Sequence, residues 1–117
     1  MLTFYGYKKC DTCRKAERVL TGAEVAYTFV DITQNPPTAE VIGAIAKQSG
    51  RTPRQMFNTS GVVYREKNIK ESAAKLSDHE ILALLAADGR LIKRPLVTDG
   101  VNSTVGFESD TFTSAWI

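Results

Sequence analysis

The chain holds two cysteines, Cys10 and Cys13, whose Cys-x-x-Cys spacing is a pattern that can carry chemistry. Such a pair can act as a metal clip, a structural disulfide or a reactive thiol site. A structural zinc site takes four ligands, and the one histidine, His79, brings the count only to three. A permanent disulfide is rare in a reducing cytosol, where we expect this protein to be. The pair is therefore interpreted as a reactive thiol site.

A strand, a loop and a helix are expected to position these cysteines. Leu2–Tyr5 is short, apolar and β-prone, and Gly6–Lys9 would form the loop that follows it. From Asp11 to Gly22 apolar residues recur at helical spacing, so Cys10 falls at the start of a helix. Unpaired backbone N–H groups and the helix dipole favour a thiolate there, and can lower a thiol pKa from ~8.5 to between ~3.5 and ~7.5.

Basic residues surround the cysteines: Lys8, Lys9, Arg14 and Lys15. Lys93–Arg94 form a second basic cluster, and a local cluster of this kind could attract an anion. We expect Lys8, Lys9 and Arg14 to lower the pKa of Cys10 further, although solvated surface charge is the alternative interpretation of the lysines. Cys13 lies one helical turn later on the same face, toward the apolar side. Its pKa should stay high. The spacing thus predicts Cys10 as nucleophile and Cys13 as the thiol that resolves the adduct as a disulfide.

Arg94 is the predicted partner of an anionic substrate, because arginine offers a planar fork of hydrogen-bond donors. It precedes Pro95 at the start of a later strand. A cis Arg94–Pro95 bond would turn the backbone toward the thiols. The alternative role for Arg94 is that of a surface salt-bridge partner.

The rest of the chain predicts a small α/β fold with a mixed sheet. A second strand at Tyr27–Ile32 gives a βαβ unit with parallel strands. Strands at Leu96–Thr98 and Ser103–Gly106 should form an antiparallel hairpin, and a helix at Glu108–Trp116 closes the chain. The expected order is βαβ…ββα in a single domain spanning residues 1–117.

Helices are expected to fill an insertion at about residues 35–90. The signals are a helix at about Thr38–Ser49, a short turn at Thr52–Phe57 and a capping box that spans Ser77 to Glu80. The last of these opens a helix that ends near Gly89. Val62–Lys75 has no clear pattern.

Charge and hydropathy narrow the class of protein. The net charge is +2, from 15 basic and 13 acidic residues, which is too balanced to predict nucleic-acid binding. No apolar run approaches the ~20 residues of a membrane span. The start of the chain lacks the apolar region of a signal peptide. We expect a cytoplasmic monomer without direct nucleic-acid or membrane contact.

Four segments, in this order, resemble a known family: YGYKKCDTCRKA, MFNTSGVVYRE, RLIKRPLVTDG and VGF. They are similar to the thioredoxin-fold family that joins arsenate reductases (ArsC) of the glutaredoxin-coupled type to the Spx/MgsR regulators. The resemblance implies a thioredoxin/glutaredoxin-like core with a helical insertion. It also implies Cys10 as nucleophile, Arg94 as an anion contact and a cis Arg94–Pro95 bond.

Further substrate contacts are expected from Lys9, Thr12, Arg14, Asn58 and Pro95. The resemblance implies no metal and no bound cofactor. It implies an external thiol reductant, either glutathione with glutaredoxin or thioredoxin, that regenerates the dithiol.

The resemblance implies two functions. The first is a thiol–disulfide oxidoreductase of the arsenate-reductase-like class, which acts on a small oxyanion or a disulfide. Glutathione-coupled arsenate reductases hold the oxyanion with two further arginines, where this chain has Asn58 and Gly106–Phe107.

The alternative is an Spx-like redox-sensing regulator. Those regulators carry a Cys-x-x-Cys like Cys10 and Cys13, whose disulfide state tunes binding to the C-terminal domain of the RNA polymerase α-subunit. A glycine that matches Gly50 contributes to that surface. A third interpretation is a family member with reactive thiols and no defined substrate.

Overall fold

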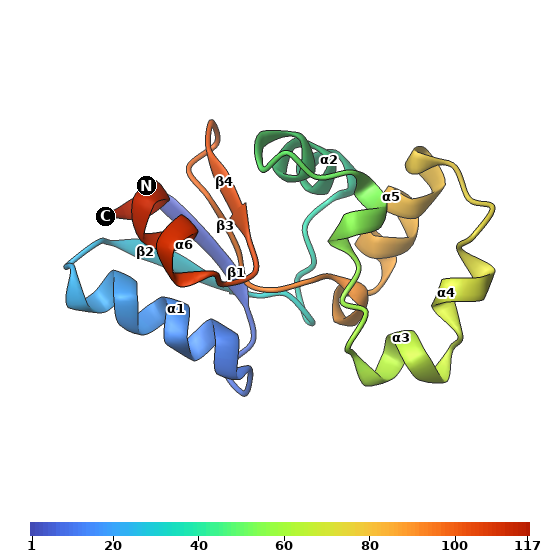
Figure 1. The fold of residues 1–117 in the computed structure, drawn as a ribbon, viewed down its shortest axis with the longest axis horizontal. Helices are drawn as coiled ribbons and strands as arrows, with labels where there is room; N and C mark the ends of the chain where they lie inside the picture. Colours follow the sequence, from blue (N-terminus) through green and yellow to red (C-terminus); the bar gives the residue numbers. More distant parts are fainter.

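The computed structural model of the protein describes residues 1–117 and contains one mixed sheet (Figure 1). Its four strands lie in the order β2-β1-β3-β4. They are β1 (Leu2–Gly6), β2 (Tyr27–Asp31), β3 (Leu96–Thr98) and β4 (Ser103–Val105). β1 and β2 are parallel, whereas β1–β3 and β3–β4 are antiparallel. The predicted mixed sheet and both predicted strand pairings are confirmed.

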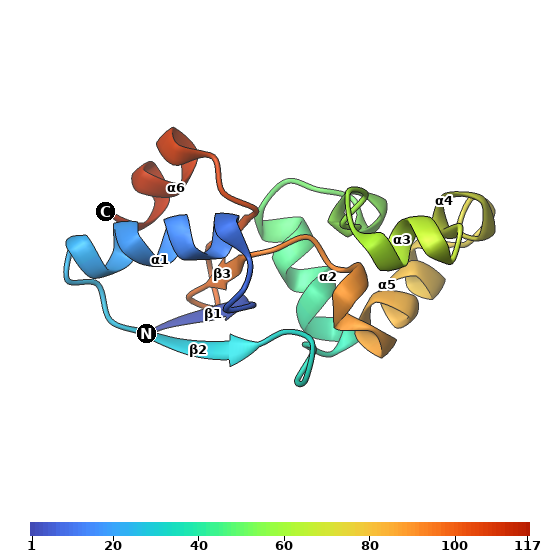
Figure 2. The same ribbon diagram turned by 90° about the horizontal axis from the view of Figure 1, so that it is seen from below.

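Two helices cover one face of the sheet (Figure 2): α1 (Asp11–Gly22) and α6 (Ser109–Trp116). The core beneath them consists of Leu2, Phe4, Cys13, Ala16, Leu20, Val97 and Phe112. Leu2 and Phe4 alternate with half-buried residues along β1, as expected for a strand that buries one face more deeply. Cys13 is thus part of this core, and its position on α1 fixes that helix against the sheet.

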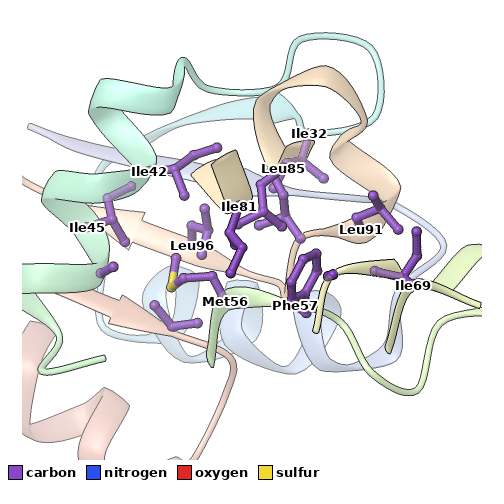
Figure 3. Close-up of a cluster of buried hydrophobic side chains, with 14 residues drawn as sticks. Ile32, Ile42, Ile45, Met56, Phe57, Ile69, Ile81, Leu85, Leu91 and Leu96 are labelled. Atoms are coloured by element: carbon purple, nitrogen blue, oxygen red, sulfur yellow. The ribbon is translucent and has the colours of Figure 1, made fainter. Parts of the chain in front are cut away.

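Helical segments fill the chain between β2 and β3. They are α2 (Ala39–Gln48), η1 (Pro53–Met56), α3 (Val62–Glu66), α4 (Ile69–Ser72), α5 (Asp78–Ala87) and η2 (Gly89–Leu91). Most of them lie beyond one end of the sheet (Figures 1 and 2). Figure 3 shows Ile42 and Ile45 of α2 packing with Ile81 and Leu85 of α5. Leu96 of β3 joins the same cluster and ties the helices to the second face of the sheet.

Local capping signals explain where several of these helices begin. Thr52 caps η1 and Ser77 caps α5, each in a capping box in which the side chain three residues later returns the hydrogen bond. The stretch without a clear sequence pattern contains α3 and α4, two short helices separated by Asn68 in the left-handed region at φ 49°. Neither helix is long enough to produce a clear apolar period.

The chain returns from the helical segments to the sheet over Gly89. A Cβ at this position would lie 1.8 Å from the carbonyl oxygen of Ile32, so only glycine fits. Two backbone hydrogen bonds then align the next residues with the segment after η1. The N–H of Lys93 donates to the carbonyl of Met56 at 2.8 Å, and the N–H of Asn58 donates to the carbonyl of Leu91 at 2.7 Å. This alignment brings Asn58 beside the Lys93–Arg94 segment.

The helices are all too short or too polar to cross a lipid bilayer.

Candidate active site

Cys10 is the N-cap residue of α1, at the end of the loop that follows β1. Its N–H donates to the carbonyl of Tyr7 at 3.1 Å and closes that loop. Its backbone is extended, and its Sγ accepts the backbone N–H of Cys13 at 3.4 Å. The sulfur therefore occupies the position of a capping oxygen, among N–H groups that have no partner within the helix. Its predicted place at the helix start is confirmed.

The surroundings of Cys10 lower its pKa below the ordinary value of 9.0. Partial burial acts in the opposite direction, but hydrogen bonds to the sulfur outweigh it. They come from Cys13, through its side chain and its backbone N–H, and from the hydroxyl of Thr12, whose Oγ1 lies 3.0 Å from Sγ. The guanidinium of Arg94 contributes in the same direction.

Cys13 has the opposite properties. Its side chain is fully buried, and its pKa is raised to about 12. Burial is the largest cause, and the neighbouring Cys10 raises the pKa further through a hydrogen bond and its charge. Both cysteines are free thiols. The pair thus contains one partly exposed thiol that ionises easily and one buried thiol that keeps its proton.

Arg94 faces this pair from the start of β3. The Arg94–Pro95 peptide bond is cis. The guanidinium carbon lies 5.5 Å from the ring centroid of Tyr7, and Nε is buried without a hydrogen-bond partner. The salt bridges of the structure lie elsewhere, at Lys8–Glu17, Arg14–Asp11 and Arg90–Asp88. The alternative interpretation of Arg94, a surface salt-bridge partner, is therefore wrong.

A hollow of about 460 Å³ joins these groups. Four of its lining residues were predicted from the sequence: Cys10, Thr12, Asn58 and Arg94. Four others were not: Ser60, Gly61, Val62 and Lys93. The lining comes from the start of α1, from the turn before α3 and from the segment before β3, so three distant parts of the sequence build it.

The other predicted contacts lie outside this hollow. Lys9 is exposed, and the guanidinium of Arg14 is 2.6 Å from Asp11. Lys8 pairs with Glu17 at 3.2 Å. The expected lysine and arginine cluster therefore does not face the sulfur, and the lowered pKa of Cys10 has the other causes given above. Pro95 is buried next to Arg94, and its carbonyl accepts the N–H of Gly106.

The fold brings together no group of three or more His, Cys, Asp and Glu side chains that could hold a metal ion.

Comparison with known proteins places this geometry in a family. The model of the ArsC family matches residues 5–115. The chain belongs to the ArsC family. It is similar to the uncharacterized protein YusI of Bacillus subtilis, with 48% identity over 98% of both chains. It is also similar to the regulatory protein MgsR of the same organism, with 24% identity over 91% of this chain and 82% of MgsR. The global transcriptional regulator Spx 1 of Bacillus cereus is 26% identical over 94% of this chain and 82% of its own.

Solved structures agree with the fold. An ArsC family related protein from Bacteroides fragilis is 36% identical, with a TM-score of 0.90 over 97% of this chain and 95% of its own. A possible arsenate reductase from Streptococcus mutans is 42% identical, with a TM-score of 0.84 over 93% of this chain and 92% of its own. The predicted fold class, with its thioredoxin-like mixed sheet, is confirmed.

Proposed function

We propose that this protein is a thiol–disulfide oxidoreductase of the arsenate-reductase-like class, in which Cys10 attacks and Cys13 resolves. The observation that carries the proposal is the contrast between the two thiols. Cys10 caps α1, lines the hollow and has a lowered pKa, whereas Cys13 is buried behind it with a pKa of about 12. The thiolate is the reactive form of cysteine, so only Cys10 is ready to attack.

The reaction with a disulfide substrate has two steps. The Cys10 thiolate forms a bond to one substrate sulfur, and the other leaves as a thiolate with the electron pair of the broken bond. Cys13 then loses its proton to solvent and attacks Cys10. This forms the Cys10–Cys13 disulfide and releases the second thiolate, so that two electrons have passed to the substrate. An external dithiol or glutathione reduces the protein again.

The first step prepares the second. Two of the causes that raise the pKa of Cys13 come from Cys10, namely its hydrogen bond and its negative charge. Once the sulfur of Cys10 is bonded to substrate, the negative charge is lost and the hydrogen bond weakens. The pKa of Cys13 therefore falls when an adduct is present, which keeps the resolving thiol inactive until it is needed.

An anionic substrate is supported by Arg94. Its side chain lines the hollow beside Cys10 and has no carboxylate partner within the protein. Asn58, which also lines the hollow, offers an amide as a second polar contact.

Turnover assays test this proposal. Arsenate is offered with glutathione and glutaredoxin, and separately with thioredoxin, and a disulfide substrate is run in parallel. Cys10→Ser should abolish turnover with every combination of substrate and reductant. Cys13→Ser should accumulate an adduct on Cys10 that mass spectrometry detects. Turnover by Cys10→Ser at the parent rate would contradict the proposal.

A redox-sensing regulator is the second candidate. It is favoured by the similarity to MgsR and Spx 1, which extends over nine-tenths of this chain. Gly50, at φ 72° in the exposed turn after α2, is available for a partner. A pull-down with the C-terminal domain of the RNA polymerase α-subunit, with the protein oxidised and reduced, tests it. Absence of binding in both states would count against the regulator.

A further inference from the structure

We propose that Lys93 and Arg94 form a two-cation site for the anionic group of a substrate beside Cys10, and that Lys93 makes the protein prefer anionic over neutral substrates. This inference rests on the proposed role of Cys10 as nucleophile. It adds a residue that the sequence patterns did not assign to the site. The substrate class it names is a small oxyanion, or a disulfide that carries carboxylates close to its sulfur atoms.

Lys93 is held in place from two sides. Its backbone N–H donates to the carbonyl of Met56 at 2.8 Å, which fixes the start of the side chain. Further out, the side chain passes over Gly106. A Cβ at Gly106 would lie 3.1 Å from Cε of Lys93, closer than most such contacts. The missing side chain of Gly106 thus leaves space for the side chain of Lys93, a residue that lines the hollow.

Neither cation forms a salt bridge with a carboxylate of the protein. Lys93 is half-buried, and no salt bridge of the structure includes Lys93 or Arg94. The Nε atom of Arg94 is buried without a hydrogen bond. Asp31, whose carboxylate senses the charge of Arg94, accepts hydrogen bonds from Thr33 at 2.6 and 2.9 Å on one of its two oxygens and forms no salt bridge with Arg94. Buried or half-buried charges are normally paired, so two cations without a carboxylate salt bridge on one hollow point to an anionic ligand.

The charge count explains why two cations are useful. The Cys10 thiolate carries one negative charge, and Arg94 alone can balance only that charge. A doubly negative substrate brought to the thiolate would then meet a site without net positive charge, and so without net attraction. Lys93 offsets the additional charge as the anion approaches. A neutral disulfide gains nothing from Lys93, so the residue should matter for one substrate class and not for the other.

A pair of disulfide reagents separates these classes. Dithiobis(nitrobenzoate) carries carboxylates, and dithiodipyridine is neutral. With either reagent the Cys10 thiolate forms a mixed disulfide and expels an aromatic leaving group that absorbs light, nitrothiobenzoate in the visible or thiopyridone in the near ultraviolet, so stopped-flow absorbance gives the rate constant. The lysine and glycine variants and their parent all carry Cys13→Ser, so that only the Cys10 step is observed in them.

Lys93→Gln should slow the reaction with the carboxylated reagent about tenfold, equal to about 1.4 kcal/mol, and change the neutral reaction less than about twofold. Lys93→Arg should restore most of the preference. Lys15→Gln, at an exposed lysine of α1 outside the hollow, is the matched control and should change neither rate. Equal effects of Lys93→Gln on both reagents, or no effect on either, would overturn the inference.

A second variant displaces Lys93 without removing its charge. Gly106 has φ +75°, a conformation that asparagine tolerates, and the new Cβ would press on Lys93. Gly106→Asn should therefore lower the preference for the carboxylated reagent. Gly100→Asn is its control, because Gly100 also has a positive φ, +94°, but a Cβ added there would meet no atom within 4 Å. If Gly106→Asn leaves the preference for the carboxylated reagent unchanged, the position of the Lys93 side chain beside Gly106 does not determine that preference.

Failure of the proposed function has a different signature. If Cys10 is not the nucleophile, Cys10→Ser with Cys13 intact reacts with the neutral reagent as fast as the wild type. If Cys10 is the nucleophile but Lys93 has no role, Cys10→Ser reacts slowly with the neutral reagent. Lys93→Gln and its parent then show the same preference for the carboxylated over the neutral reagent.

Discussion

Cys10 and Cys13 have the same side chain, and their positions alone make them different. The sulfur of Cys10 lies at the open end of α1, where Thr12, Arg94 and a backbone N–H stabilise the thiolate. The sulfur of Cys13 lies one turn later in the apolar core beneath α1, where burial disfavours the thiolate.

The hydroxyl of Thr12 provides a direct test at this scale. Thr12→Val keeps the shape of the side chain but removes the group 3.0 Å from the sulfur of Cys10. The hydroxyl stabilises the charged form of Cys10 through a hydrogen bond, so the pKa of Cys10 should rise when it is removed. The pKa of Cys10 is measured by following the ultraviolet absorbance of the thiolate against pH in a Cys13→Ser background.

Thr113→Val is the control, because Thr113 lies exposed on α6 and its hydroxyl makes no hydrogen bond to the sulfur. An equal shift in both variants would mean that the Thr12 hydroxyl is not a specific stabiliser of the thiolate.

Lys93 shows which site residues a sequence can and cannot predict. The pattern around Cys10 is local, because a strand, a loop and a helix follow one another within about twenty residues, and that pattern was sufficient. The role of Lys93 depends on its path over Gly106, which follows it by thirteen positions in the sequence. No local period or motif encodes such a contact. Arg14 differs, because its ion pair with Asp11 is a local contact between residues three apart on α1, and this pair turns a predicted site residue away from the sulfur.

At the scale of elements, α5 determines where the Lys93–Arg94 segment begins. It carries Ile81 and Leu85 into the larger core cluster and leads through η2 toward that segment. Its first turn is closed by Ser77 and Glu80, each of which accepts a backbone N–H from the other. This capping box was predicted because all of its parts lie within four residues.

Ser77→Ala tests the contribution of this cap. Loss of a serine N-cap costs about 1 kcal/mol of helix stability, so the free energy of unfolding should fall by about that amount. Urea unfolding followed by circular dichroism measures the change.

Ser114→Ala is the matched control for Ser77→Ala, because Ser114 lies exposed within α6 and has no capping role. It should change the free energy of unfolding by less than about 0.5 kcal/mol. If the two variants lose equal stability, the cap of α5 is not what holds that helix.

The helices around Asn68 mark where prediction from sequence ends at this scale. α3 and α4 comprise five and four residues, fewer than the window in which a helical period becomes visible. The packing of Ile69 and Ala73 into the core cluster supports them instead. Such tertiary contacts involve distant parts of the chain and leave no local pattern.

At the scale of the whole molecule, the hollow lies where two packed units meet. One is the sheet with α1 and α6, and the other is the group of helices between β2 and β3 (Figure 1). Cys10 and Thr12 come from the first unit, Asn58 and Val62 from the second, and Arg94 from the segment that returns to the sheet. The geometry of the site therefore depends on how firmly the helices are held against the sheet.

The two thiols also affect the stability of the whole fold, with opposite signs. Between its lowered pKa and 9.0, Cys10 binds fewer protons in the folded than in the unfolded protein, so its contribution to stability rises with pH. Cys13 ionises above 9.0 in the unfolded chain but only at about 12 in the folded protein. Its contribution therefore falls as pH rises through that window.

Urea unfolding of the reduced protein across this pH range measures the balance. The difference in unfolding free energy between the wild type and Cys10→Ser/Cys13→Ser should rise to a maximum near pH 9.0 and decline above it. The double variant removes both titrations and leaves those of all other groups in place. A difference that does not vary with pH would contradict both assignments.

The use of a sulfur atom as a helix cap has a consequence for how the redox state could be observed. The N–H of Cys13 donates to the sulfur of Cys10, and a thiolate accepts a hydrogen bond far better than a disulfide sulfur does. Each oxidation of Cys10 should thus loosen the first turn of α1, and each reduction should tighten it. Deuterium uptake at the amide of Cys13 would then report the redox state from the backbone, without any label on the thiols. Faster uptake in the oxidised protein is the expected result, and equal uptake in both states would show that the cap does not depend on the charge of the sulfur.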